Sequence, residues 1–330
     1  FRRVLFRSGV LDLGRKSSTR ISLTVVEMAE FHSDFDVATK AQPMNKGLVS
    51  EAKPVVSAWV VFLTLLGLTL RHFSDGDYTF VVTAGAGVQC LGFWLLLQKV
   101  NSARSAAGVS SKMLEMYLIQ LIFRLSSTLI KEGYLPIDRS GDHIYQAFDI
   151  GSLCLVFQLL WCVNKKYKTT YESEFDTMPV WNAVPGLLVL AMCVHGHMNK
   201  SFFYDTVWTF SVHLDTIAML PQFWLFVKKG GAVEAALGNF VACIVASRAL
   251  SFAFWFYGYQ ALKPRKRDGG GPNIAGYLVF ASHAMQLLLS ADFMYHYFVW
   301  QCQNSPCGSM VGCGSNLTGQ NSMVLPTIDV

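Results

Sequence analysis

Charged residues are scarce in this sequence. Only 15% of its 330 residues are Asp, Glu, Lys or Arg, whereas an ordinary soluble domain has about 25%. Hydrophobic residues make up 52% and aromatic residues 13%, and the mean hydropathy is +0.35. The formal net charge of +5 is modest and comes mostly from loops, which argues against a nucleic-acid partner. The composition predicts an all-α, polytopic membrane protein.

Metal-binding and catalytic patterns are also lacking. Five of the eight cysteines lie in apolar runs, and Cys302, Cys307 and Cys313 lie in the C-terminal tail without zinc spacing or a histidine. We expect the tail cysteines to be surface thiols or palmitoylation sites, with a metal site as the less favoured alternative. No nucleophile stands beside a base, and His195 and His197 are expected at a polar surface. The sequence therefore predicts no metal, no cofactor and no enzyme.

The N-terminal region lacks the basic, apolar and small-residue pattern of a signal peptide. The segment "RRVLFRS" that follows Phe1 looks like adapter sequence, and the first methionine is Met28. We expect residues 1–27 to be a non-native or disordered extension and residues 28–53 to be a polar tail.

Apolar runs long enough to cross a bilayer occur about eight times. They are Val55–Leu70, Tyr78–Leu97, Met113–Ile130, Phe148–Val163, Val180–Val194, Tyr204–Val227, Val233–Tyr257 and Ile274–Trp300. This pattern predicts an N-terminal helix at residues 54–72, a seven-helix domain at residues 78–300 and a polar C-terminal tail at residues 301–330.

The distribution of Lys and Arg favours cytosolic termini only weakly. With both termini cytosolic, eleven basic residues lie on the cytosolic side and eight on the other. The cytosolic set is Lys40, Lys46, Lys53, Lys99, Arg104, Lys112, Lys165, Lys166, Lys168, Lys228 and Lys229. The run "KPRKRD" at residues 263–268 opposes this orientation.

Seven charged residues fall inside the predicted spans, where each costs roughly 2.5–3.5 kcal/mol on insertion. They are Glu115, Arg124, Asp149, Asp205, Asp215, Arg248 and Asp292. This is too many for chance, so they indicate function, although an Asp–Arg pair can also be purely structural.

Arg124 is the most informative of these charges. A lone arginine in "LIFRLSS" must meet an anion or line a wet cavity, and its planar guanidinium suits a carboxylate. Asp215 and Arg248 lie on successive spans and are expected to pair, which would leave Arg124 free for a ligand. Trp208 and Trp255 lie seven residues from Asp215 and Arg248, or about two turns, so each shares its charge's helix face. Packing in the core is the competing interpretation of both tryptophans.

Five segments, in order and with near-constant spacing, resemble the KDEL receptors, or ER lumen protein retaining receptors. They are "ARSAAGVSSK", "KYKTTYESEFDT", "WTFSVHLDTIAMLPQ", "SRALSFAFW" and "QLLLSADFMYHY". The resemblance covers roughly residues 78–300. The segments "VVFLTLLGLTLRHFSDGDYTF" and "AFDIGSLCLVF" resemble the receptor-related branch with an additional N-terminal helix.

The resemblance implies the fold of PQ-loop and SWEET transporters, in which two three-helix repeats are joined by a linker helix. Pro221-Gln222 corresponds to the PQ signature. A proline there removes one backbone hydrogen bond and is expected to bend the helix where a cavity forms.

The resemblance also implies a ligand site. Arg124 matches the arginine that holds the carboxylate of a C-terminal signal, and Asp205 matches the acid that faces the signal's basic residue. Trp208 and Trp255 match aromatic walls of the pocket.

A switch is implied as well. Asp215 and Arg248 match its internal ion pair, and Asp292 matches the aspartate needed for the transport-competent state.

Several positions depart from the family pattern. Two signal-reading arginines, the pH-sensing histidine, the switch tyrosine and a further aspartate are replaced by Val82, Gly258, Gln89, Ser247 and Ser127. The tail also lacks a dilysine-type signal. We hypothesise that His213, His283 or His296 takes over the pH response, although a hydrogen-bonded core histidine is the competing interpretation for each.

Three functions remain open. The first is a sorting receptor of ER and Golgi membranes that binds C-terminal signals of lumenal proteins (KDEL- or HDEL-like) and contacts membrane lipid, vesicle coat and trafficking machinery. The second is a receptor-related paralogue with altered or no cargo binding. The third is a SWEET-like transporter of a small polar solute. The retained charges favour the first over the third, and the departures favour the second over strict KDEL retrieval.

Overall fold

The computed structural model describes residue 64, residues 80–131, 139–197, 201–229, 232–262 and 272–304, and residues 322–324. Its long helices are α3 (Phe80–Ala103), α4 (Ser111–Thr128), α5 (Arg139–Trp161), α7 (Phe202–Ile217), α9 (Ala235–Gly258) and α10 (Ile274–Asn304). Two shorter helices are α6 (Val184–Cys193) and α8 (Leu220–Lys228). A π-helical segment η3 (Cys162–Lys166) ends α5, followed by the 3-10 turns η4 (Lys168–Thr170), η5 (Val180–Asn182) and η6 (Tyr259–Leu262). The predicted helix at residues 54–72 lies outside the described residues, apart from Thr64.

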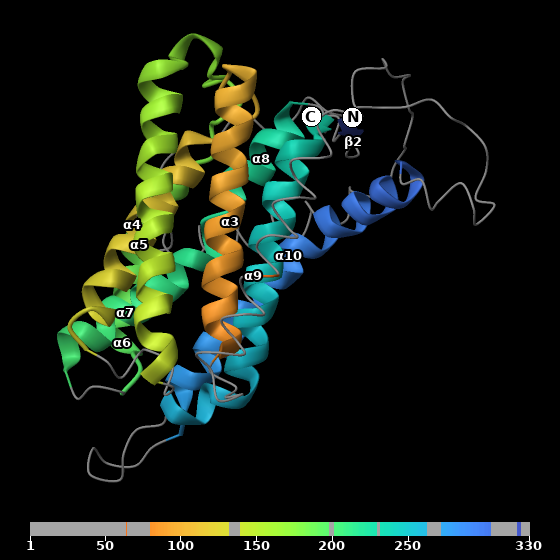
Figure 1. Ribbon diagram of the computed structural model, residues 1–330. Coiled ribbons are helices and arrows are strands. Elements are labelled where there is room, and N and C mark those ends of the chain that lie inside the picture. Colours follow the sequence, from red (N-terminus) through yellow and green to blue (C-terminus); the bar gives the residue numbers. More distant parts are fainter. Residues whose placement is uncertain are drawn as a thin grey trace, which may run out of the picture.

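The helices form one bundle whose members run mostly along a common direction, with the end of α10 leaving it at an angle (Figure 1). Helix α3 packs against α9 and α5, α4 packs against α7 and α5, and α10 packs against α9 and α7. By length and apolar composition, five helical segments of the described chain can cross a membrane, and α6 is a shorter apolar helix. Helix α4 is not one of these five segments, because its 18 residues include three charged ones, Lys112, Glu115 and Arg124. The polytopic all-α prediction is therefore confirmed in outline, while the repeat architecture stays a prediction.

The sixth apolar run, predicted at Tyr204–Val227, forms one segment that can cross a membrane, Phe202–Lys228, with an interruption inside it. It divides into α7, which ends at Ile217, and α8, which begins at Leu220. Pro221 has no backbone N–H, so the carbonyl of Ile217, four residues earlier, receives no helical hydrogen bond from it. The chain turns at Ala218 and Met219 instead. The bend expected at Pro221-Gln222 is thus present as a break between two helices.

The core lies where α3, α4 and α9 meet. Phe93 packs edge-on against Tyr117 with ring centroids 5.1 Å apart, and it contacts Phe240 at 5.8 Å. Small residues let α3 approach α9 closely: a Cβ atom on Gly92 would lie 3.0 Å from the Cβ of Cys243. Close backbone approach through small residues is a common way to pack helices in a membrane.

Two short strands lie at the end of the bundle near α8. Strand β1 (Ala232–Glu234) pairs antiparallel with β2 (Ser322–Val324), with Val233 opposite Met323. Helix α10 ends at Asn304, four residues beyond the predicted end of the last span at Trp300.

Candidate ligand site in the helix bundle

Arg124 is paired inside the protein. Its Nη2 atom donates a hydrogen bond to Oδ1 of Asp149 at 2.6 Å, between α4 and α5. Asp149 is fully buried and Arg124 is only 9% exposed. The expectation that Arg124 stands free for a ligand is therefore wrong, because the packing of α5 on α4 brings a carboxylate to it. Its Nε atom is buried and has no hydrogen-bond partner among the described residues.

Asp215 and Arg248 form the second buried ion pair. Nη2 of Arg248 lies 2.7 Å from Oδ1 of Asp215, which joins α9 to α7. The contact is an ion pair by distance, but its angles are not those of a hydrogen bond. The predicted pairing of these two residues is confirmed; their role in a switch stays a prediction.

The two ion pairs are neighbours and share tyrosines. The guanidinium carbon of Arg124 lies 5.9 Å from the ring centroid of Tyr145, and that of Arg248 lies 5.9 Å from that of Tyr117. Tyr117 is also within electrostatic range of Arg124. Two arginines, two aspartates and two aromatic rings therefore form one polar centre in the bundle.

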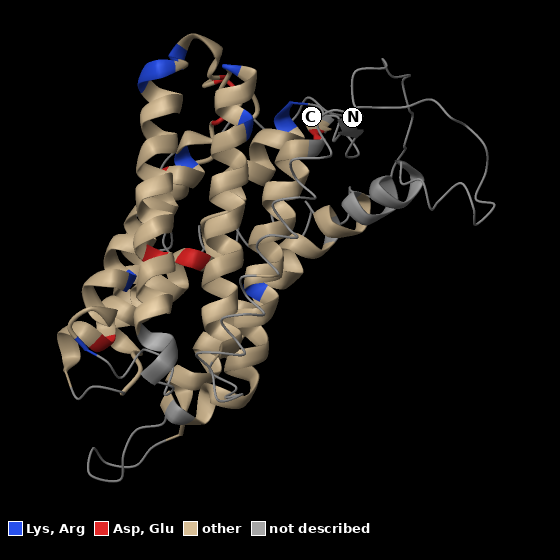
Figure 2. Cartoon of the chain, viewed as in Figure 1, with Lys and Arg blue, Asp and Glu red and all other residues tan. Residues whose placement is uncertain are grey.

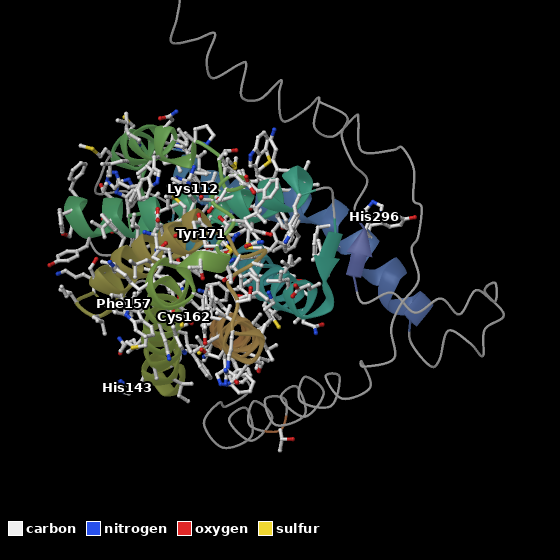
Figure 3. All side chains as sticks on the ribbon, turned by 90° about the horizontal axis from the view of Figure 1, so that it is seen from above. Lys112, His143, Phe157, Cys162, Tyr171 and His296 are labelled. Atoms are coloured by element: carbon white, nitrogen blue, oxygen red, sulfur yellow. The ribbon has the colours of Figure 1, made fainter. Side chains whose placement is uncertain are left out.

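Two histidines, His213 of α7 and His283 of α10, are neighbours of this centre. Nδ1 of His213 lies 2.9 Å from Oγ of Ser282, while its Nε2 atom is buried without a partner among the described residues. His283 is buried, and neither ring nitrogen has a hydrogen-bond partner in the described part of the chain. His296 lies elsewhere, on the portion of α10 that extends away from the bundle (Figure 3). Of the three histidines proposed for pH sensing, two are therefore near the buried charges.

Asp205, Trp208 and Trp255 are buried near the N-terminal end of α7. The rings of Trp208 and Trp255 lie with centroids 5.4 Å apart and planes at 59°. Asp205 is in the first turn of α7, where the positive end of the helix dipole favours a carboxylate. The sequence predicted that each tryptophan shares a helix face with a charged residue. The structure adds that Trp208 of α7 and Trp255 of α9 contact each other.

Asp292 and the five positions that depart from the family pattern lie on several helices. Asp292 is on α10, but its side chain lies outside the described residues. Gln89 and Ser247 are buried on the facing helices α3 and α9, and their side-chain polar atoms have no hydrogen-bond partner in the described structure. Ser127 donates to the carbonyl of Tyr204 at 3.2 Å. Val82 is half-buried, and Gly258 is the last residue of α9.

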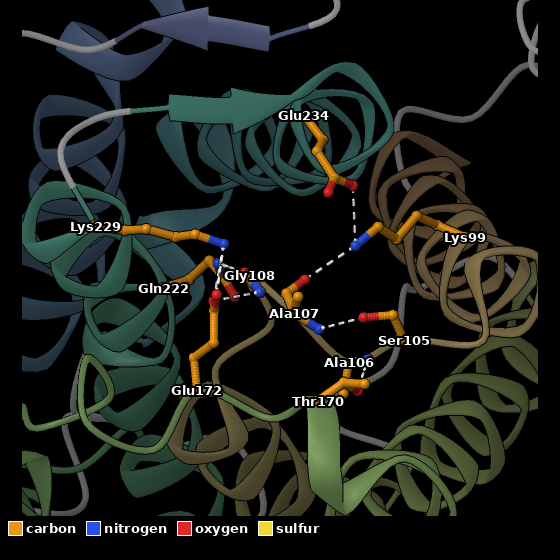
Figure 4. A network of polar contacts seen from close by, with 10 residues as sticks. All are labelled: Lys99, Ser105, Ala106, Ala107, Gly108, Thr170, Glu172, Gln222, Lys229 and Glu234. Carbon is orange, nitrogen blue, oxygen red and sulfur yellow. Dashed lines mark hydrogen bonds and ion pairs between the residues drawn. The ribbon is translucent and has the colours of Figure 1, made fainter.

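Sequence reasoning missed the function of Gln222, the second residue of the PQ signature. Its Nε2 atom donates to the carbonyl of Gly108 at 2.7 Å, and its Oε1 atom accepts from the backbone N–H of Ser110 at 2.9 Å. The side-chain amide of Gln222 thus satisfies backbone hydrogen-bonding groups of the loop between α3 and α4 (Figure 4). A glutamine after a helix-breaking proline was the available signal, but its partner is more than 100 residues away.

The same loop is also held by charged side chains. Glu172 accepts from the N–H of Gly108 at 3.0 Å and pairs with Lys229 at 2.9 Å (Figure 4). Lys99 donates to the carbonyl of Ala107 at 3.0 Å and pairs with Glu234 at the same distance. The loop is therefore fixed from α3, α8, β1 and the segment after α5.

Asp176 completes this arrangement. It accepts from Ser110 Oγ at 2.8 Å, from the N–H of Lys112 at 3.2 Å and from the hydroxyl of Tyr171 at 2.7 Å. Burial raises the pKa of Tyr171, and the hydrogen bond to Asp176 raises it further, so the phenol stays a donor. Figure 3 shows Lys112 and Tyr171 over the middle of this end of the bundle.

A bundle of apolar helices with two ion pairs and a tryptophan pair in its interior defines a polytopic membrane protein with an internal polar site. The model of the ER lumen protein retaining receptor family matches residues 105–258. The matched segment supports the resemblance of the chain to this family.

Individual relatives agree. The chain is 28% identical over 207 residues to "ER lumen protein-retaining receptor" of Dictyostelium discoideum, which covers 62% of this chain and 86% of that protein. It is 28% identical over 208 residues to "ER lumen protein-retaining receptor B" of Arabidopsis thaliana, with the same coverage. For receptor A of the same plant the identity is 25% over 220 residues, or 66% of this chain and 92% of the relative.

Proposed function

We propose that this chain is a sorting receptor of ER and Golgi membranes that binds C-terminal retention-type signals of lumenal proteins for Golgi-to-ER retrieval. The observation that carries the proposal is Arg124, a buried guanidinium whose Nε donor is unused in the described structure. A C-terminal carboxylate is the anion that its remaining donors fit. We place both termini in the cytosol and count vesicle coat and trafficking machinery among the partners.

The proposed pocket walls lie at a similar depth to Arg124. Ser127 contacts Tyr204, so the C-terminal end of α4 meets the N-terminal end of α7. Arg124 is three residues inward from Ser127, and Trp208 is four residues inward from Tyr204, or roughly 4.5 Å and 6 Å along their helix axes. Asp205 would face a basic residue of the signal, and Trp208 and Trp255 would pack against its aliphatic parts.

The ligand specificity is proposed to differ from strict KDEL retrieval. Val82 and Gly258 stand where the resemblance implies arginines, so the acids of a KDEL-like signal lose two charged partners. Each charge-assisted hydrogen bond contributes roughly 1.5–3 kcal/mol, so their loss is expected to weaken such signals by several decades. Signals with fewer acidic residues are favoured.

The pH response is assigned to the histidines near the polar centre. Gln89 does not titrate, whereas His213 and His283 lie between α7 and α10, and both have buried ring nitrogens without partners in the described chain. Protonation would place a positive charge near Arg248 and so disturb the Asp215–Arg248 ion pair. The proposed switch would depend on this rearrangement and on Asp292.

One observation favours a second candidate, a receptor-related protein without cargo binding. Asp149 already supplies a carboxylate to Arg124 at 2.6 Å, as a ligand would. In that case the pair is a permanent part of the structure, and the protein acts through partners. A SWEET-like solute transporter is the third candidate, tested separately by uptake into proteoliposomes.

Peptide binding tests the first candidate. Purified protein is titrated with labelled peptides ending in KDEL, HDEL or neutral variants at about pH 5.5 and about pH 7.4. We expect binding that falls on the order of ten- to hundredfold when the peptide is C-terminally amidated, because amidation removes the carboxylate. No binding at either pH, or equal binding of amidated peptides, contradicts the receptor proposal.

The Asp149→Asn variant separates the first two candidates. If Asp149 yields Arg124 to a ligand, the variant binds the free-acid peptide more tightly, and the peptide raises its melting temperature while the amidated peptide does not. If Asp149 is a permanent partner, neither peptide shifts the melting temperature of the variant or of the natural protein.

A further inference from the structure

Four basic side chains gather at the loop end of α3 and α5. Arg104 follows the last residue of α3, Lys165 and Lys166 end the π-helical segment η3, and Lys168 begins η4. All four are exposed. Figure 2 shows basic residues collected at this end of both helices. We call this set the basic rim.

The two helices hold the rim together. Nζ of Lys166 donates to Oδ1 of Asn101 at 3.2 Å and lies 4.8 Å from the ring centroid of Tyr167. Arg104 is close enough to Lys166 for their positive charges to repel each other. The rim is therefore one concentrated patch of positive charge drawn from α3 and from the end of α5.

The rim has no acidic partner within the described chain, where none of its four residues forms an ion pair. The nearby acids of the loop network are engaged: Glu172 pairs with Lys229 and Glu234 pairs with Lys99. Asp176 accepts from Ser110, Lys112 and Tyr171. The charge of the rim is thus left for an external anion.

The backbone under the rim is irregular on both helices. Arg104 has φ +49°, the left-handed region that side chains other than glycine seldom adopt. The end of α5 widens into a π-helical turn that contains Lys165 and Lys166. Such turns and unfavourable backbone angles recur at functional sites. Both distortions fall at the residues that carry the charge.

Large aromatic side chains lie directly below the rim. Trp161 is four residues, or one helical turn, before Lys165 and is 53% exposed, and Phe157 lies one turn further and is 66% exposed. Figure 3 places Phe157 at the periphery of the bundle. A tryptophan at the end of a membrane-crossing helix marks the level of the lipid headgroups. The rim therefore stands beside the headgroup phosphates.

We propose that the basic rim is a binding site for the phosphate headgroups of anionic membrane lipids. The unpaired charge, the aromatic residues below it and the position at the end of two membrane-crossing helices together specify a lipid and not a soluble anion. The side that holds the rim is the one that the distribution of Lys and Arg favours as cytosolic, where anionic lipids concentrate. The site is remote from Arg124 and does not depend on cargo binding.

Reconstitution into neutral phosphatidylcholine nanodiscs tests the proposal. A fluorescent phosphatidylserine or phosphoinositide is titrated in, and energy transfer from the protein reports its local enrichment. Lys165→Gln with Lys168→Gln is expected to weaken enrichment about tenfold or more. Arg104→Gly is expected to weaken it severalfold while relieving the positive φ, so a misfolded loop cannot explain the loss.

The matched control is Lys228→Gln, which removes one exposed positive charge from α8 at the same end of the molecule. It is expected to leave lipid enrichment unchanged. Equal loss in this control, or no loss in the rim variants, overturns the proposal. Competition by a soluble inositol trisphosphate or by a phosphopeptide as strongly as by the lipid would overturn the assignment to membrane lipid.

Discussion

At the scale of single residues, buried charges depend on their partners. Arg124 and Asp149 neutralise each other between α4 and α5, and neither side chain is more than about a tenth exposed. Removing one member of a buried pair leaves an uncompensated charge, which costs more than removing both. The residue-scale predictions follow from this asymmetry and from the buried amide of Gln222.

The first prediction concerns the Arg124–Asp149 pair. Without ligand, Asp149→Asn is expected to destabilise the protein by about 3–5 kcal/mol, because it strands the buried guanidinium. The double variant Arg124→Met with Asp149→Asn is expected to recover most of this loss. Thermal unfolding in detergent measures both. A double variant as unstable as the sum of its single variants contradicts the prediction.

The second prediction concerns Gln222. Gln222→Met keeps the volume but removes the partners of Gly108 O and Ser110 N, so we expect a loss of about 2–4 kcal/mol from two unmatched backbone groups. Gln146→Met is the control, since Gln146 is half-buried and donates one bond at 3.3 Å. Thermal unfolding of both variants is the measurement. Equal effects would mean that Gln222 does not hold the loop.

At the scale of elements, the contacts between helices depend on small residues and breaks. Helix α3 approaches α9 through Gly85 and Gly92, and a Cβ atom on either would lie within 3.2 Å of an α9 atom. The break before α8 sets Gln222 against the α3–α4 loop. Side chains of wrong size at such contacts force the helices apart.

The third prediction concerns the α3–α9 contact. Gly92→Leu is expected to destabilise the bundle by about 1–3 kcal/mol, because Cys243 and Phe240 leave no room for the side chain. Gly186→Leu is the control, since nothing lies within 4 Å of a Cβ atom on that α6 glycine. Melting temperatures of the two variants give the comparison. A larger shift for Gly186→Leu would refute the close-packing interpretation.

At the scale of the whole molecule, one end of the bundle is tied to a segment from the far end of the chain. Strand β2 comes after α10 in sequence but pairs with β1 beside the Lys99–Glu234 ion pair. This pairing is two short strands, so it adds order to β1 without supporting the bundle. The effect expected of β2 is therefore confined to β1.

The fourth prediction follows from that pairing. Truncation after Asn304 removes β2, so the amide protons of Ala232, Val233 and Glu234 are expected to exchange about tenfold faster or more. Exchange within α3 and α9 is expected to stay unchanged. Hydrogen–deuterium exchange with mass spectrometry measures both regions. Unchanged exchange in β1 would show that β2 does not protect it.

The sequence alone indicated the membrane class, most of the helices and five charged residues that are buried, namely Arg124, Asp149, Asp205, Asp215 and Arg248. Apolar runs and costly charges are local properties, so they can be read residue by residue. It also indicated the Asp215–Arg248 pair and the two tryptophans, because each lies on a recognisable helix face. The five segments indicated the receptor family that the chain resembles.

Only the tertiary structure decided which groups meet. Arg124 pairs with Asp149, and the sixth apolar run divides into α7 and α8. Gln222 forms hydrogen bonds with a loop that lies 112 to 114 residues earlier in the sequence. The tertiary structure also gathered the basic rim from α3 and α5. Contacts of this kind depend on how helices distant in sequence are packed, and hydrophobic periodicity fixes which face is buried without fixing the partner that faces it.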